Sequence, residues 1–146
     1  MTSWRDTASE RAQADLDGLL NPALGFAQQQ LEQHGEFFPY AVVVRADGET
    51  EMVAARPDAD DDRPASNDVI DACRTTLAER RDRLRAAAVV ADVRLPAGGD
   101  AIRVELEHTE GPALTVLLPY GRKRFGRGID FGQLQAAAGT RHVWPD

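Results

Sequence analysis

The segment of this chain with the clearest capacity for chemistry is a basic, glycine-rich run, residues 121–128. Its basic side chains are Arg122, Lys123, Arg124 and Arg127. The intervening glycines allow the close backbone approach that a phosphate group requires. However, the run lacks the lysine and serine or threonine of a P-loop, and the later residues of an RNA-binding RNP1 motif. Two interpretations stay open: a site for an anion such as a nucleotide, or a surface loop whose arginines pair with acidic groups of the same chain.

A second candidate is the acidic segment at residues 56–65, because alternating aspartates open the calcium loop of an EF-hand. The aspartates with that spacing are Asp58, Asp60 and Asp62. The sixth position of such a loop requires glycine for a sharp turn, and the twelfth requires a bidentate glutamate. This chain has Arg63 and Val69 at those positions. We therefore expect a solvated acidic loop, and the sequence predicts neither a metal site nor a cofactor.

The remaining reactive residue types form no catalytic pattern. The histidines are His34, His108 and His142, and they are not at metal-ligand spacing. We expect His34 and His108 on the surface, although a folded site that joins His108 to Glu36 or Glu105 stays open. Cys73 lies on an apolar helical stripe, which predicts a buried thiol in a reducing compartment. No serine lies in a nucleophile elbow. No catalytic residue is assigned, which favours a non-enzymatic protein.

The charge distribution argues against nucleic acid and membranes as partners. The chain has 146 residues and a formal net charge of −7. Residues 121–146 carry +3, from five basic and two acidic residues, so the rest of the chain is strongly acidic. Nucleic acid and anionic membranes repel an acidic protein. The chain begins without an apolar signal region, and no apolar run approaches the roughly 20 residues of a membrane span. We expect a single cytoplasmic domain over residues 1–146.

Two helices are predicted in the first part of the chain. Residues 4–20 have a weak helical pattern, and Asn21-Pro22 interrupts it because proline disfavours a helix interior. Asn21 would cap a second helix from Pro22 to His34, which Gly35 would end. The segment before this break, residues 1–20, is a possible helical arm. Because such an arm has little core of its own, we expect it to pack across a second copy in a homodimer.

A β-hairpin is predicted next. The strand Phe37 to Ala46 contains three consecutive valines, which favours a central strand covered on both faces. Asp47-Gly48 is a typical two-residue turn, and the strand Glu49 to Ala55 returns nearer an edge of the sheet. In that register Val44 lies opposite Glu51.

The second half of the chain is predicted to form one helix and three strands. The helix spans about Ser66 to Ala87, and a short final helix could span Asp130 to Ala138. The strands cover residues 88–95, 102–107 and 114–120, the middle one with a wet face of alternating charged residues. The predicted core residues are Leu31, Val42, Val44, Ile70, Cys73, Leu77, Val89, Val104, Val116 and Leu118. The fold class is therefore α+β: an antiparallel sheet of about five strands, in the order helix-strand-strand-helix-strand-strand-strand.

This order of elements, over residues 22–138, resembles the roadblock/longin and profilin-like architectures, in which helices flank a five-stranded antiparallel sheet. The run His34-Gly35-Glu36-Phe37-Phe38-Pro39-Tyr40, followed by Asp47-Gly48-Glu49, resembles a group of small uncharacterised bacterial proteins, a resemblance that implies no activity. We expect an interaction, adaptor or immunity-type protein that binds another protein or itself. The alternative is a small-anion or nucleotide-binding module that uses residues 121–128, and charge reversal at Arg122 and Arg124 would separate the two.

Overall fold

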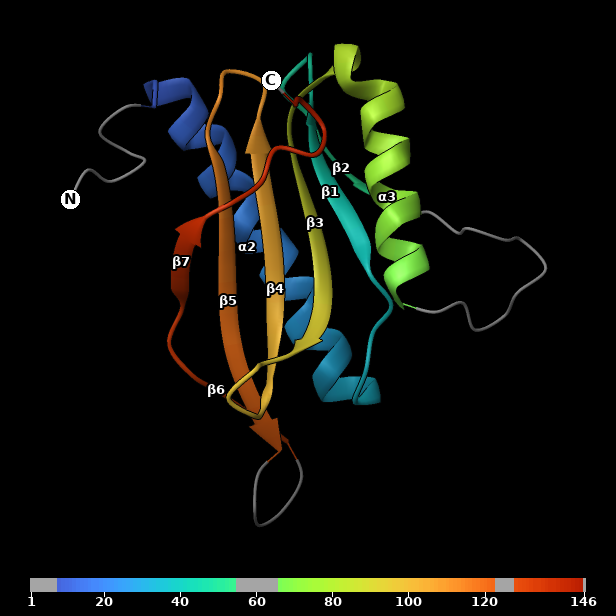
Figure 1. Cartoon of the computed structure of the whole chain (residues 1–146), viewed down its shortest axis with the longest axis vertical. Helices are drawn as coiled ribbons and strands as arrows, with labels where there is room; N and C mark the ends of the chain where they lie inside the picture. The colour runs from blue at the N-terminus through green and yellow to red at the C-terminus, as the bar shows by residue number, and fades with distance from the viewer. Residues whose placement is uncertain (1–7, 55–65, 123–127, 146) are drawn as a thin grey trace.

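The computed structural model describes residues 8–54, 66–122 and 128–145. Its elements are the helices α2 (Glu10–His34) and α3 (Ser66–Arg80), the short 3-10 helix η1 (Arg81–Arg83), and the strands β1 (Tyr40–Arg45), β2 (Thr50–Val53), β3 (Leu84–Arg94), β4 (Asp100–His108), β5 (Ala113–Arg122), β6 (Ile129–Phe131) and β7 (Gln135–Ala138). The strands form one antiparallel seven-stranded sheet in the order β2-β1-β3-β4-β5-β6, and β7 also pairs with β5. Helix α2 covers one face of the sheet and α3 lies on the other (Figure 1). The predicted α+β class is confirmed, with more strands than expected.

Helix α2 is continuous through Pro22, so the predicted break at Asn21 is wrong. The helix begins after Ser9, whose side chain accepts a hydrogen bond from the backbone N–H of Ala12, and ends at Gly35 in the left-handed conformation, as expected. Leu19 and Ala23, on either side of the proline, are both fully buried against the sheet. This packing outweighs the cost of a proline in a helix interior, about 3 kcal/mol. Residues 10–20 therefore pack on their own sheet, which removes the reason for expecting an arm exchanged between two copies.

The core has two parts because the sheet is buried on both faces. Val42 and Val44 of β1 face α2, whereas Val43 faces α3. The prediction of a central strand covered on both sides is thus confirmed. The ten predicted core residues are each 7% exposed or less: Leu31, Val42, Val44, Ile70, Cys73, Leu77, Val89, Val104, Val116 and Leu118.

The register of the first hairpin differs from the prediction by one residue. Val44 pairs with Thr50, not with Glu51. The N–H of Arg45 donates to the carbonyl of Glu49, and the N–H of Gly48 donates back to the carbonyl of Arg45. The loop therefore holds one residue more than a two-residue turn, and Gly48 occupies a left-handed conformation at φ 91°. A type I turn followed by such a glycine is a common hairpin connection, and the sequence Asp-Gly fits both kinds of turn.

Two predicted helical segments are strands in the structure. Residues 84–87 begin β3 instead of ending α3, and residues 129–138 contain β6 and β7 instead of a helix. Both segments are rich in alanine, which has the highest helix propensity, but propensities of ordinary residues differ by at most about 0.7 kcal/mol per residue. Residues 84–87 pair with β1, and β6 and β7 pair side by side with the outer edge of β5. Sheet pairing across the chain therefore overrides local helical preference in both places.

Replacing Leu77 with alanine tests the packing between α3 and the sheet. The Leu77 side chain is fully buried in the core that α3 shares with β1 and β3. We expect a loss of about 2–5 kcal/mol in the free energy of unfolding, because the lost transfer energy and the new cavity add together. Urea denaturation followed by circular dichroism measures this change. A loss below about 1 kcal/mol would mean that α3 does not pack as described.

Candidate functional site

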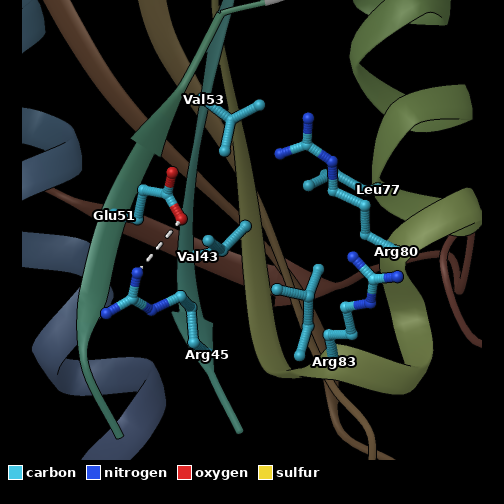
Figure 2. A pocket seen from close by; sticks show the side chains of 8 residues that line it. Val43, Arg45, Glu51, Val53, Leu77, Arg80 and Arg83 are labelled. Atoms are coloured by element: carbon cyan, nitrogen blue, oxygen red, sulfur yellow. Dashed lines mark ion pairs between the residues drawn. The ribbon is translucent and has the colours of Figure 1, made fainter. Parts of the chain in front are cut away.

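A pocket of about 270 Å³ lies between the β1–β2 hairpin and the carboxyl end of α3. Its apolar lining comes from Val43, Val53, Leu77 and Leu84, and its charged lining comes from Arg45, Glu51, Arg80 and Arg83. Figure 2 shows the valines between two charged sides, one from the hairpin and one from the end of the helix. The pocket is therefore an apolar hollow with a predominantly cationic rim.

Alternation and helical spacing explain how the lining residues come together. Side chains two apart on a strand share a face, which places Val43 with Arg45 on β1 and Glu51 with Val53 on β2. Residues three apart on a helix also share a face, so Arg80 emerges beside the buried Leu77. Arg80 at the end of α3 and Arg83 in η1 thus lie on the same side of the sheet as Arg45 of the hairpin.

The arginines of the rim differ in how they are paired. Arg45 forms ion pairs with Asp47 at 3.3 Å and with Glu51 at 3.8 Å. The side chains of Arg80 and Arg83 are exposed and make no hydrogen bond or ion pair with another residue that the structure describes. In Figure 2 the Arg80 side chain extends over the pocket toward Val53. Two guanidinium groups therefore stand beside an apolar surface without a described anionic partner.

This geometry suits binding. A guanidinium group donates two parallel hydrogen bonds to a carboxylate or phosphate, and its geometry matches such anions. The apolar lining can take an aliphatic group attached to the anion. The lining contains no serine, cysteine, histidine or lysine that could act as a nucleophile or general base. The pocket can hold an anionic group joined to an apolar one.

His108 is buried, so its predicted surface position is wrong. Its Nε2 lies 2.8 Å from Oδ2 of Asp15, and the other carboxylate oxygen of Asp15 accepts a 2.7 Å hydrogen bond from Arg85. The Nδ1 of His108 accepts a hydrogen bond from the backbone N–H of Glu110, so the neutral ring carries its proton on Nε2 and donates to Asp15. Both ring nitrogens are thus engaged. The cluster ties α2 to β3 and β4 and leaves no ring nitrogen to activate a substrate.

The electrostatics of Asp15 favour its ionised form. Burial opposes ionisation of this carboxyl, but the hydrogen bonds from Arg85 and His108 and the positive charge of Arg85 outweigh it and hold the pKa below its ordinary value. The side chain is 9% exposed. Asp15 is therefore a buried anion that depends on its two partners.

The other residues considered from the sequence do not assemble with His108. Glu105 accepts hydrogen bonds from Arg74 at 2.6 and 2.9 Å and lies 3.2 Å from Arg103. His34 and Glu36 are exposed at the end of α2 and just beyond it. The structure therefore does not join His108 to Glu36 or Glu105, the alternative that the sequence left open.

The expected wet face of β4 is also covered at one end. Glu107 is only 5% exposed, because its carboxylate accepts hydrogen bonds from the backbone N–H groups of His142, Val143 and Trp144. The segment that follows β7 therefore folds back across the sheet, as the red trace in Figure 1 shows. Within this segment Val143 is buried, and Trp144 packs against the same core as α3.

The structure describes only one basic residue of the predicted anion loop. Arg122 is the last residue of β5, and its guanidinium donates a 3.0 Å hydrogen bond to the carbonyl of Gly35. Lys123, Arg124 and Arg127 lie outside the described residues, as do the aspartates of residues 56–65. The anion site at residues 121–128 therefore stays a prediction.

Sequence reasoning missed the pocket at the hairpin. The basic residues near the end of α3 were visible in the sequence, but they have an ordinary explanation as cations at a helix carboxyl terminus. Arg45 is 35 or more positions away from them and shows no relation to them in the sequence. Only the pairing of β1 with β3 brings the start of β3, and with it the end of α3, beside Arg45.

Comparison with known proteins does not assign the chain to a family. No protein-family model matches the chain, and no curated protein or solved structure is significantly similar to it. Over the described ranges, no group of three or more histidine, cysteine, aspartate or glutamate side chains is arranged to hold a metal ion. Neither of the helices in the described part of the chain is long and apolar enough to cross a membrane. The functional argument therefore rests on the pocket.

Proposed function

We propose that this chain is a non-enzymatic interaction protein of the adaptor or immunity type, which acts in the cytoplasm by binding a protein partner at the hairpin pocket. The observation that carries the proposal is the pair of exposed guanidinium groups, Arg80 and Arg83, beside an apolar hollow. A partner that presents a carboxylate next to an aliphatic side chain would satisfy both features. The chain has an acidic net charge, so most of its surface repels acidic groups. An acidic partner would therefore be attracted only at the cationic rim of the pocket.

The buried polar clusters are consistent with the same function, because their side chains are engaged in hydrogen bonds within the protein. Arg85 and His108 each bind Asp15, and Glu107 accepts hydrogen bonds from backbone amides. Neither cluster leaves a reactive group aimed at a cavity. The described chemistry of the molecule thus lies in recognition at its surface, which is what an interaction protein requires.

A second candidate function is binding of a small anionic ligand such as a nucleotide. The size of the pocket is compatible with this function, because a volume of about 270 Å³ can hold part of a small ligand. The basic run at residues 121–128 is the alternative site for such a ligand. The two functions differ in whether peptide or nucleotide binds, and in which arginines the binding needs.

The test is an NMR titration of the full chain with three probes: a short valine-rich peptide with one central glutamate, the matching peptide with lysine in place of the glutamate, and ATP. We expect only the glutamate peptide to shift the amide signals of the hairpin and the end of α3. The double variant Arg80→Glu, Arg83→Glu should weaken this binding at least about tenfold, because it replaces both charge-assisted contacts with repulsion. Binding should also weaken as salt rises, since exposed charges are screened over about 8 Å at physiological ionic strength.

The matched control is the double variant Arg11→Glu, Arg94→Glu. It makes the same change in net charge at exposed residues of α2 and at the far end of β3, away from the pocket. This control should bind the glutamate peptide as the unaltered chain does. If both double variants lose the same affinity for the glutamate peptide, the effect comes from net charge and not from the pocket. Amide shifts caused by ATP at residues 121–128 would support the second candidate function instead.

A further inference from the structure

We infer that the partner segment binds as an extra strand on the outer edge of β2, with its acidic side chain directed to Arg80. This inference rests on the proposed function and specifies the chemistry of the partner: an extended, acidic peptide segment. The first observation is that β2 is the last strand at its end of the sheet and pairs only with β1 among the described strands. Addition of a peptide strand to such an edge is a recurring mode of recognition.

The pairing of β2 with β1 identifies the backbone groups that the edge offers. The hydrogen bond from Arg45 to Glu49 marks a hydrogen-bonded pair, and in an antiparallel ladder such pairs alternate with pairs that are not bonded to each other. Glu51 and Val53 therefore direct their N–H and C=O groups toward β1. Thr50 and Met52 direct theirs outward, where an added strand would receive them.

The side chains of an added strand would meet the pocket on one face of the sheet. Glu51 and Val53 line the pocket, so neighbouring residues of the new strand that share their face lie along its border. In Figure 2 the Arg80 side chain extends toward Val53 from the α3 side, so a carboxylate on the new strand opposite Val53 would reach Arg80 across the Val53 side chain. A carboxylate directly opposite Glu51 would meet a like charge and is disfavoured. The site thus selects a segment in which one acidic residue occupies a defined position.

The opposite face of β2 gives the partner a second, apolar contact. Met52 is 47% exposed, which is unusual for a large apolar side chain and places a flexible hydrophobe beside the open edge. β2 also contains no proline or lysine, the residues that commonly protect edge strands from pairing. A segment with one acidic residue opposite Val53 and apolar residues on its other face would therefore match β2 in backbone hydrogen bonds, in charge and in apolar contact.

Amide hydrogen exchange of the full chain with the glutamate peptide tests the inference. The amides of Thr50 and Met52 should exchange at least about tenfold more slowly in the complex, because they gain hydrogen bonds. The amides of Glu51 and Val53, already directed to β1, should change much less and serve as the internal control. Protection of all four amides to the same extent would contradict strand addition, because it would indicate general stabilisation.

Two further reagents keep the test decisive. Met52→Pro removes an outward N–H and leaves the ladder to β1, because proline is tolerated on the open side of an edge strand. It should weaken binding at least about tenfold. If this variant fails to fold, a peptide N-methylated at alternate residues performs the same test on the unaltered protein. One of the two N-methylation patterns should abolish binding and the other should preserve it.

The outcomes separate this inference from the proposed function. Peptide binding that depends on Arg80 and Arg83, without slower exchange at Thr50 and Met52 and without an effect of N-methylation, would overturn strand addition and leave the function in place. Absence of any peptide binding would overturn the function itself. Slower exchange at Thr50 and Met52 that grows with protein concentration, without peptide, would show that a second copy of the chain occupies the edge and would overturn the peptide assignment.

Discussion

Replacing Asp15 with alanine is expected to lower the free energy of unfolding by about 3–5 kcal/mol, because removal of one partner leaves buried charge uncompensated. Arg85 would lose its 2.7 Å hydrogen bond, and the Nε2–H of His108, whose side chain is 1% exposed, would lose its acceptor. The change acts at the junction of α2 with β3 and β4, so it should weaken the whole domain. Urea denaturation at neutral pH measures it.

The pH dependence of the same residue gives an independent check. The ordinary pKa of Asp15 is 3.8, and its pKa in the folded protein is lower. The unfolded chain therefore binds the proton more readily, and stability from this group is fully present above the ordinary pKa. It is lost as pH falls through the lower, folded-state pKa. The difference in stability between the unaltered chain and Asp15→Asn should narrow as the pH falls below 3.8.

Glu32→Ala is the matched control for Asp15, because it removes a carboxylate from an exposed position of the same helix. Surface substitutions of this kind usually change stability by less than about 0.5 kcal/mol. If Asp15→Ala is no more destabilising than Glu32→Ala, the cluster with Arg85 and His108 does not hold the helix to the sheet.

Replacing Glu107 with alanine is expected to release the segment that follows β7, at a cost of about 1.5–3 kcal/mol for the loss of hydrogen bonds to a charged acceptor. Its carboxylate receives the N–H groups of His142, Val143 and Trp144, with distances of 2.9 Å from Val143 and 3.0 Å from Trp144. The segment also packs closely elsewhere. A Cβ on Gly139 would lie 2.7 Å from the backbone of Leu114, so only glycine fits there without a shift.

Release of the segment can be measured in two ways. Trp144 is half-buried against the α3 side of the core, so its fluorescence should move to longer wavelength in a Trp4→Phe background that isolates it. Trypsin should also cleave after Arg141 more rapidly. Glu79→Ala, at an exposed position of α3, is the control for loss of a glutamate. Unchanged fluorescence and cleavage in Glu107→Ala would show that other contacts hold the segment.

Local sequence patterns correctly predicted the core residues and several element boundaries of this protein. The three valines of β1 are consecutive, and consecutive apolar residues on a strand face opposite sides, so burial on both faces followed directly. Gly35 ends α2 because glycine adopts the left-handed conformation at low cost. These features depend on residues close together in the chain, where alternation, helical period and turn chemistry act.

Elements whose local preference is weak depend instead on long-range packing and strand pairing. Helix α2 continues through Pro22 because buried residues on both sides of it pack on one sheet, and this packing outweighs a local cost. Residues 84–87 and 129–138 form strands because neighbouring strands supply partners for their backbone groups. Helix preference differs among ordinary residues by at most about 0.7 kcal/mol, which is small beside a row of backbone hydrogen bonds and buried side chains.

The candidate site also depends on long-range packing, because its residues are distant from one another in the chain. The pocket draws on β1, β2, α3, η1 and β3, and no local pattern relates Arg45 to Arg80. The burial of His108 likewise depends on Asp15, which lies on another element. Periodicity specifies which face a side chain occupies, whereas the meeting of two faces depends on long-range pairing. That is why composition and spacing defined an α+β domain, and only the packed sheet placed Arg80 and Arg83, which have no partner among the described residues, beside an apolar hollow.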